Sequence, residues 1–248
     1  MKYVSVEEAV GLPGLRIAFT RGVPSPWGLA ARTIFELKGI DYVAVAQEAG
    51  APNEALRAWT GQTSAPVAVL DGERPRSSWF ELLLLAERLR PAPRLIPLDE
   101  DERTMMFGLC HEISAEDGLG WNLRLLLMER PGSLSSARMR AKYTVGGSLE
   151  DARRRVNAIV GLLARKLTEQ AASGSSFFVG DALSAADIYW TAFSNLLSSM
   201  PRDICVAPDY YSALGEFGST HLDQPLPSIL IEHRDRILRD HFALPIQF

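Results

Sequence analysis

Residues 15–28, LRIAFTRGVPSPWG, contain a short apolar segment, a turn and the start of a helix in immediate succession. The run Leu15–Thr20 predicts a short buried strand, because buried strands are brief apolar segments bounded by turn residues. Pro26 suits the first turn of the following helix, where the N–H group that proline lacks has no partner to lose. This helix is expected to continue to about Lys38 and to end at Gly39, since glycine favours the position after a helix.

Strand-like and helix-like segments continue to alternate after this stretch. In chain order they are a strand at 42–46, a short helix at 53–59, a strand at 66–70, a turn at Asp71-Gly72, a short fourth strand, and a helix from Ser77 or Ser78 to Leu89. The order β-α-β-α-β-β-α is typical of an α/β domain with a partly parallel sheet and one antiparallel pair. We therefore expect an α/β domain over residues 14–90, preceded by an N-terminal extension, residues 1–13.

Residues 91–98 contain three prolines and predict a linker to a second, all-helical domain over residues 99–248. The expected helices cover 100–129, interrupted by Gly118 and Gly120, then 149–172, a segment after Ser184, and about 228–241 with Ser228 as cap. Residues 201–227 are expected to form a long loop with a short helix at most. Ser184 and Asp187 have the spacing of a capping box, and the flanking Leu183 and Ile188 can form a hydrophobic staple.

The composition excludes several classes of protein. The chain has 248 residues, a formal net charge of −4, 47 % apolar and 23 % charged residues, as folded globular proteins have. Its two cysteines, Cys110 and Cys205, exclude a disulfide framework and a four-cysteine zinc site, and the four histidines are scattered. The mild acidity argues against a nucleic-acid binder, and no apolar run has the length of a membrane helix. We expect a cytoplasmic protein, because no apolar leader pattern is present. We also expect no metal, because Cys110, His111 and Glu112 are adjacent on a helix and point different ways, and no second cluster exists.

Four short motifs, in order and suitably separated, carry a resemblance to a known family. They are residues 25–27 (SPW) with Arg32 and the segment 36–40 (ELKGI), residues 65–67 (APV), Ser77-Ser78 at a helix start, and residues 180–187 with the capping box. Over roughly residues 14–200 the chain resembles the cytosolic glutathione S-transferases, in their serine type. The resemblance implies an α/β plus all-α fold, in which a thioredoxin-like N-terminal domain is followed by a helical-bundle C-terminal domain.

The resemblance assigns the catalytic role to Ser25. Glutathione conjugation requires a thiolate, yet a free thiol has a pKa of about 8.5 and is only a few per cent ionised at neutral pH. A helix N-terminus offers free N–H groups and a positive dipole end, and the Ser25 hydroxyl can donate a hydrogen bond to the sulfur. Because the serine keeps its own proton, no histidine base is needed. The alternative is that Ser25 is only a turn or cap residue.

The resemblance also implies that glutathione binds to Trp27, Ala65, Pro66, Ser77 and Ser78. A cis bond before Pro66 would expose the backbone of Ala65 for strand-like pairing with the cysteinyl part of glutathione, whereas the alternative is a trans proline on an edge strand. Ser78 at a helix start can bind the γ-glutamyl carboxylate. Ser77 departs from the family, which has an acid there to hold the ammonium group. Glu81 or a residue of a partner chain is a hypothesis for the missing countercharge.

A second substrate, a small hydrophobic electrophile, is expected between the domains near Trp27, Trp121 and Arg124. The family further implies a homodimer with a role in detoxification. Two alternatives stay open at this point. One is a glutathione-dependent isomerase or dehalogenase that uses the same site, and the other is a noncatalytic binding protein of this fold, which Ser77 favours. Binding to immobilised glutathione separates the second alternative from the enzymes.

Overall fold

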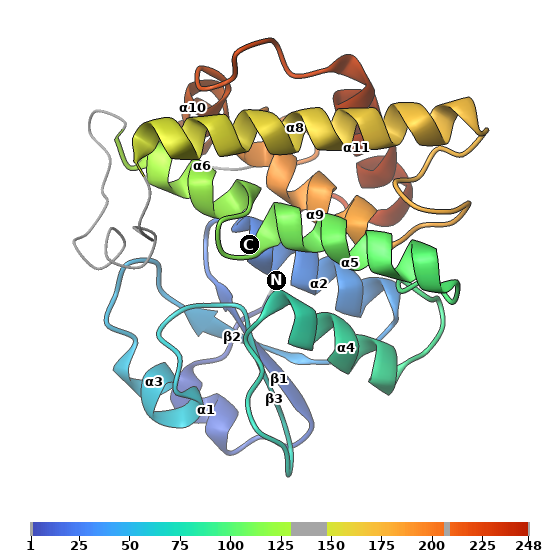
Figure 1. Cartoon of the computed structure of the whole chain (residues 1–248). Helices are drawn as coiled ribbons and strands as arrows, with labels where there is room; N and C mark the ends of the chain where they lie inside the picture. The colour runs from blue at the N-terminus through green and yellow to red at the C-terminus, as the bar shows by residue number, and fades with distance from the viewer. Residues whose placement is uncertain (1, 130–147, 206–208, 248) are drawn as a thin grey trace.

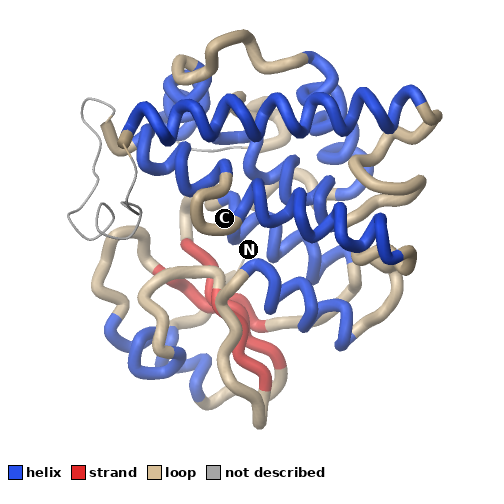
Figure 2. Tube along the Cα trace, viewed as in Figure 1, coloured by secondary structure: helices blue, strands red, loops and turns tan. Residues whose placement is uncertain are grey.

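A small mixed sheet forms the core of the N-terminal part of the chain. The computed structural model describes residues 2–129, 148–205 and 209–247, and of residues 209–212 the backbone alone. Strand β1 (Leu15–Thr20) lies at the centre of a three-stranded sheet, parallel to β2 (Val43–Gln47) and antiparallel to β3 (Val67–Leu70). The strands gather at one end of the molecule, whereas the rest is helical (Figure 2). This arrangement confirms the expected fold class.

The short fourth strand expected after Asp71-Gly72 is wrong for the described residues. In its place Arg76 makes a single antiparallel bridge with Ala68, with N–H···O distances of 2.8 and 2.9 Å. Pro75 has no N–H group to extend the ladder, and a helix already begins at Trp79. The chain therefore has too little length between the turn and the helix for a strand.

The N-terminal extension adds to the other edge of the sheet. Val4 forms a parallel bridge with Val45 of β2, and the short helix α1 (Val6–Val10) follows it. Ser5 and Glu8 cap this helix reciprocally, the Glu8 carboxylate accepting the Ser5 N–H at 2.8 Å. The extension thereby shields an edge strand that would otherwise present unpaired backbone groups.

Three helices accompany the sheet: α2 (Pro26–Leu37), α3 (Glu54–Thr60) and α4 (Trp79–Leu89). Helix α2 begins and ends within one residue of the prediction, and Gly39 after it has a φ of 58°, a left-handed conformation that glycine adopts at low cost. Ile34 and Phe35 of α2 are fully buried. Ile34 and Phe35 belong to one hydrophobic core that includes residues of the sheet and of the helical part, so α2 links the two (Figure 1).

The rest of the described chain is helical. Its elements are α5 (Glu100–Ser114), α6 (Leu119–Leu127), α8 (Leu149–Ala172), α9 (Ala185–Phe193), the 3₁₀ turn η1 (Ser194–Leu196), α10 (Asp209–Ser219) and α11 (Ser228–His241). Every residue of α9 is buried, and this helix lies among α2, α5 and α11 (Figure 1). The apolar segment after Ser184 is therefore the centre of the helical part, as its composition predicted.

The expected long loop at 201–227 underestimates the structure, because α10 has eleven residues. Two of its glycines let the helix approach η1 closely. A Cβ at Gly215 would lie 3.0 Å from the carbonyl oxygen of Asn195, and one at Gly218 would overlap the carbonyl oxygen of Leu196. The glycines that lower helix propensity thus serve the packing of α10. The last helix also differs slightly from the prediction, since its N-cap is Pro227 and not Ser228.

A fully buried lysine fixes the end of α2 to the proline-rich segment that follows α4. The Nζ atom of Lys38 donates to the carbonyl oxygens of Arg90 at 2.9 Å and Pro93 at 2.7 Å. It also forms an ion pair with Glu87 of α4 at 2.7 Å, and its side chain is 0 % exposed. One ammonium group therefore contacts a largely buried carboxylate and two backbone carbonyls at the junction between the sheet and the helices.

Replacing Lys38 by methionine should lower the free energy of unfolding by about 3–5 kcal/mol, because the largely buried Glu87 carboxylate keeps the Leu95 N–H but loses its opposite charge, and two backbone carbonyls lose their donor. Urea unfolding of Lys38→Met measures this loss. The exposed Lys2 provides the control, since Lys2→Met should change the stability by less than about 0.5 kcal/mol. Equal stabilities of the two variants would contradict the role given to Lys38.

Candidate functional site

The hydroxyl group of Ser25 lies at the N-terminus of α2 but does not cap the helix. Ser25 is the N-cap residue of α2, but its side chain makes no capping hydrogen bond. Its carbonyl oxygen accepts the first helical bond, from Leu29 N at 2.7 Å. Within the described residues the hydroxyl has no hydrogen-bond partner. The group is thus free to donate to a ligand at the positive end of the helix.

A small cavity of about 20 Å³ adjoins Ser25 and is formed by parts of the chain that are far apart in sequence. Thr20 at the end of β1, Tyr3 of the N-terminal extension, Arg32 of α2 and Gln247 all line it. Arg32 pairs with Glu36 at 2.7 Å, and its guanidinium also donates to the carbonyl oxygen of Gln247. Both ends of the described chain therefore contribute to the surroundings of Ser25.

The tail that carries Gln247 is held in place by backbone pairing. The N–H of Ile246 donates to the carbonyl oxygen of Ile204 at 2.8 Å, and the Ile246 side chain is buried. Burial raises the pKa of the Tyr3 phenol, although Arg32 and Arg21 oppose this shift. Tyr3 is therefore neutral at physiological pH, and the charged side chain that lines the cavity is that of Arg32.

The peptide bond between Ala65 and Pro66 is cis, which confirms that part of the sequence prediction. Pro66 is buried, and β3 starts at the next residue, Val67. Within the described chain, neither the N–H nor the C=O of Ala65 has a hydrogen-bond partner. Ala65 therefore has backbone groups available for an extended ligand.

The start of α4 is closed by a capping box between Ser78 and Glu81. The Ser78 hydroxyl accepts the N–H of Glu81 at 3.2 Å, while Oε2 of Glu81 accepts the N–H groups of Ser77 and Ser78, each at 3.3 Å. Arg74 pairs with the other carboxylate oxygen at 2.6 Å. Partial burial opposes ionisation of Glu81, but the hydrogen bonds from Arg74, Ser78 and Ser77 together lower its pKa. Glu81 is thus a carboxylate whose charge already has partners within the chain.

Trp27 lies between the sheet-containing part and the helices. Its indole N–H donates to the carbonyl oxygen of Ser114 at the end of α5, at 2.8 Å. Its ring meets Phe193 of α9 edge to face, with 4.7 Å between the ring centroids. Trp121 and Arg124 are half-buried on α6. Trp27 is thus partly buried and packs against the core. None of these three residues lines either of the two cavities of about 20 and 590 Å³.

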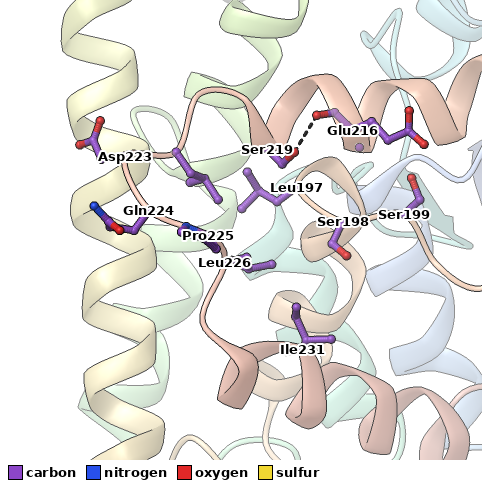
Figure 3. Close-up of a pocket in the computed structure, with 12 residues that line it drawn as sticks. Leu197, Ser198, Ser199, Glu216, Ser219, Asp223, Gln224, Pro225, Leu226 and Ile231 are labelled. Carbon is purple, nitrogen blue, oxygen red and sulfur yellow. Dashed lines mark hydrogen bonds between the residues drawn. The ribbon is translucent and has the colours of Figure 1, made fainter.

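The larger of the two cavities, about 590 Å³, lies away from Ser25 in the helical part (Figure 3). Leu197, Leu226 and Ile231 contribute apolar side chains to it, and Ser198 and Ser199 contribute hydroxyl groups. It contains none of the site residues expected from the sequence. The structure therefore brings Ser25 together with Tyr3, Arg32 and Gln247, and none of these four residues lines the larger of the two cavities.

Tyr3, Arg32 and Gln247 were not among the site residues predicted from the sequence, although Arg32 belongs to the motif that begins at Ser25. Arg32 follows Ser25 by seven residues, which places both on one face of a helix, so its spacing is a usable signal. Tyr3 and Gln247 carry no such signal, because their positions depend on the pairing of Val4 with Val45 and of Ile246 with Ile204.

The two cysteines do not supply a thiolate. Both thiols are free and buried, and burial raises the pKa of Cys205 to about 11 and that of Cys110 well above its ordinary value. Across residues 2–129, 148–205 and 209–247 there is no group of three or more His, Cys, Asp or Glu side chains suited to a metal ion. No helix in these same ranges has the length and apolar character needed to cross a membrane.

Comparison with solved structures identifies the fold. A glutathione S-transferase from Methylobacillus flagellatus KT with glutathione bound superimposes with a TM-score of 0.64 at 16 % identity, covering 93 % of this chain and 100 % of the other. The chain has the glutathione transferase fold. A glutathione S-transferase from Xanthobacter autotrophicus Py2 gives a TM-score of 0.59 at 19 % identity, with 93 % and 96 % of the two chains covered.

A third protein of this fold carries a different activity in its name. Maleylacetoacetate isomerase from Anaeromyxobacter dehalogenans 2CP-1 gives a TM-score of 0.54 at 20 % identity and covers 90 % of this chain and 86 % of the other. No protein-family model matches the sequence, and no curated protein matches it either. At these identities the comparisons establish the shared fold, which agrees with the expected thioredoxin-like sheet followed by helices.

Substitution of Gly120 tests the packing of Trp27 against Phe193 of α9. A Cβ there would overlap the ring of Phe193 and lie 3.0 Å from Trp27, so Gly120→Ala should lower the free energy of unfolding by about 1–3 kcal/mol. Gly108 in α5 has open space around it, so Gly108→Ala should raise the stability by about 0.5–1 kcal/mol. Denaturant titration of both variants measures these opposite shifts, and shifts of the same sign would contradict the packing described.

Proposed function

We propose that this protein is a glutathione transferase, which activates the thiol of glutathione for attack on a small hydrophobic electrophile. The observation that carries the proposal is the unengaged Ser25 hydroxyl at the N-terminus of α2. It occurs in a fold whose solved examples include a protein with glutathione bound. The reaction would need no metal.

The chemistry follows from the charge that a thiolate develops. Glutathione loses its thiol proton to solvent, and the sulfur then forms a bond to the electrophilic carbon. In a substitution the leaving group departs with its bonding pair; in an addition the double bond opens and the resulting carbanion takes a proton from solvent. A hydrogen bond from Ser25 and the dipole of α2 both favour the anionic sulfur over the neutral thiol. A hydrogen bond to a charged group is worth about 1.5–3 kcal/mol, which corresponds to one to two pKa units.

The remaining parts of the proposed site surround the bound tripeptide. Ala65 would pair with the cysteinyl backbone of glutathione through its free N–H and C=O, and the start of α4 at Ser77 and Ser78 would face the γ-glutamyl end. We assign glutathione binding to residues 14–90 and contacts with the electrophile to the helical part, residues 99–248, near Trp121 and Arg124. Trp27 would serve by fixing the start of α2.

We also propose a homodimer in the cytoplasm. An aromatic cluster of Trp79, Phe80 and Phe107 joins α4 and α5, with 5.6 Å between the ring centroids of Phe80 and Phe107. Phe80 is 43 % exposed although it is a large apolar residue, so this surface is suited to a second copy of the chain. A cytoplasmic location fits the two free cysteines.

Isomerisation is the second candidate activity, because a maleylacetoacetate isomerase shares this fold. In that reaction glutathione adds to the substrate and later leaves, so it acts as a catalyst. A panel with an aryl halide, an epoxide, a peroxide and a maleyl compound distinguishes conjugation from isomerisation by the product formed. A role in detoxification corresponds to conjugation of foreign electrophiles.

Ser25→Ala should lower the conjugation rate at pH 6.5 by about ten- to a hundredfold, because loss of the hydrogen bond raises the pKa of the bound thiol by one to two units. The deficit should shrink as the pH rises through that pKa, where the thiol ionises without help. A pH profile of kcat measures both effects. Ser173→Ala, at an exposed serine that ends α8, is the control and should leave the profile unchanged.

An unchanged kcat for Ser25→Ala at neutral pH, with an unchanged melting temperature, would contradict the role given to Ser25. Retention on immobilised glutathione provides a separate readout. A chain that binds glutathione but neither conjugates nor isomerises any member of the panel would be a binding protein.

Phe80→Lys should convert the proposed dimer to a monomer, because it places a charge within the aromatic cluster of α4 and α5. Sedimentation velocity measures the change in mass. Leu149→Lys is the matched control, since Leu149 is 44 % exposed on α8 and lies outside the cluster. A wild-type protein that sediments as a monomer, or a dimer that survives Phe80→Lys, would contradict this interface.

A further inference from the structure

The larger cavity, about 590 Å³, has a volume within the range usual for small-molecule sites in proteins. Its walls come from four segments, namely residues 197–199 after η1, the second half of α10, the loop 222–226 and the start of α11 (Figure 3). Among the described residues, none lines both this cavity and the one beside Ser25. A molecule held here would therefore leave the surroundings of Ser25 unoccupied.

Contacts behind the cavity fix its walls. The loop is tied to α8, because Asn157 accepts the N–H of Asp223 at 2.8 Å and Arg153 pairs with the Asp223 carboxylate at 2.5 Å. On the side of α11, the buried guanidinium of Arg234 donates to the carbonyl oxygen of Ser198 at 3.0 Å. A cavity whose walls are already ordered loses little conformational entropy when a ligand enters, which favours binding.

The inner surface of the cavity is apolar on three of its four walls. The side chains responsible are those of Leu197, Leu222, Leu226 and Ile231. Such side chains favour a ligand with an apolar ring or chain, because contact with it removes apolar surface of both partners from water.

The cavity also carries one unpaired negative charge. Two acidic residues line it, on opposite sides in Figure 3, and no described lysine or arginine does. Asp223 is neutralised by Arg153, whereas the Glu216 carboxylate makes no hydrogen bond or ion pair with any described residue. The charge that a ligand meets in the cavity is therefore that of Glu216.

We propose that this cavity binds a small amphipathic cation, an aryl or alkyl ammonium ion. Its apolar part would contact the leucine and isoleucine side chains, and its ammonium group would pair with Glu216. Apolar contact supplies most of the affinity in such a site, while the fixed charge decides which sign of ligand is accepted. An anion of the same shape would be repelled by Glu216. This binding is separate from the reaction proposed at Ser25.

The test compares three naphthalenes that differ only in the group at one ring position: the aminomethyl compound, cationic at neutral pH, the neutral hydroxymethyl compound and the anionic carboxylate. Equilibrium dialysis measures their affinities for the wild-type chain. Because Glu216 is exposed and its charge is screened by water, the cation should bind about three- to tenfold more tightly than the neutral compound. The carboxylate should bind most weakly.

Glu216→Gln removes the charge and keeps the shape of the side chain, so it should bind the cation and the neutral compound with affinities within about twofold of each other. Glu232→Gln is the matched control. Glu232 is exposed on α11 beside Ile231, but it does not line the cavity, so the wild-type preference should persist.

A larger apolar side chain at Leu226 tests the location. Leu226→Trp should lower the affinity for the cation at least about tenfold, because the indole occupies the cavity. Ser219→Phe, at an exposed residue of the same cavity, makes the same test if Leu226→Trp lowers the melting temperature. Saturating glutathione should leave binding of the cation unchanged.

The contrary results overturn the inference. They are the absence of binding by all three compounds, equal affinities for them, a preference that survives Glu216→Gln or is lost equally in Glu232→Gln, and full affinity in the folded cavity-filling variants. Displacement of the cation by glutathione also overturns it, because the cation would then occupy the site near Ser25. None of these results contradicts conjugation at Ser25, which the pH profile of Ser25→Ala tests separately.

Discussion

A fully buried carboxylate, that of Asp187, fixes the helix around which the helical part of the molecule packs. Its Oδ2 accepts both the N–H and the hydroxyl of Ser184 at 2.8 Å, and its Oδ1 accepts the N–H of Phe178 at 2.9 Å. The imidazole of His233 from α11 lies 3.1 Å from Oδ1. A buried carboxylate is tolerated only when its oxygens have such partners. The start of α9, the loop before it and α11 are therefore tied to one group.

The position of the candidate site depends on this helix. Phe193 at the end of α9 contacts Trp27, and the Trp27 indole donates to Ser114 of α5. Trp27 lies two residues after Ser25, so these contacts orient the first turn of α2. Lys38 fixes the other end of the same helix to Arg90 and Pro93. The Ser25 hydroxyl is thus presented by a helix that is held at both ends by residues distant in sequence.

Much of the secondary structure could be predicted from the sequence, because it depends on signals between neighbouring residues. The strand at Leu15–Thr20, the helix after Pro26 and the capping box at Ser184 follow from signals within a few residues, and all are present. The predictions failed where tertiary contacts decide. A fourth strand was expected from a hairpin turn, yet Pro75 and an early helix prevent it, and α10 forms because its glycines fit against η1.

In the site, Ser25 and Pro66 could be predicted from motifs. Tyr3 and Gln247 could not, because backbone pairing at two separate edges brings them to Ser25.

The carbonyl of Gln247 accepts from Arg32, and both residues line the cavity beside Ser25. A ribosome synthesises a chain from the N-terminus at about 5–20 residues per second, so N-terminal parts of a protein fold first. The strands and α2 can therefore be complete while the segment that carries Gln247 is still inside the exit tunnel. During that interval the Ser25 hydroxyl lacks one wall of its surroundings. The surroundings of Ser25 are in this way completed only after residue 247 has left the tunnel, and a chain truncated before that residue would lack this wall of the cavity.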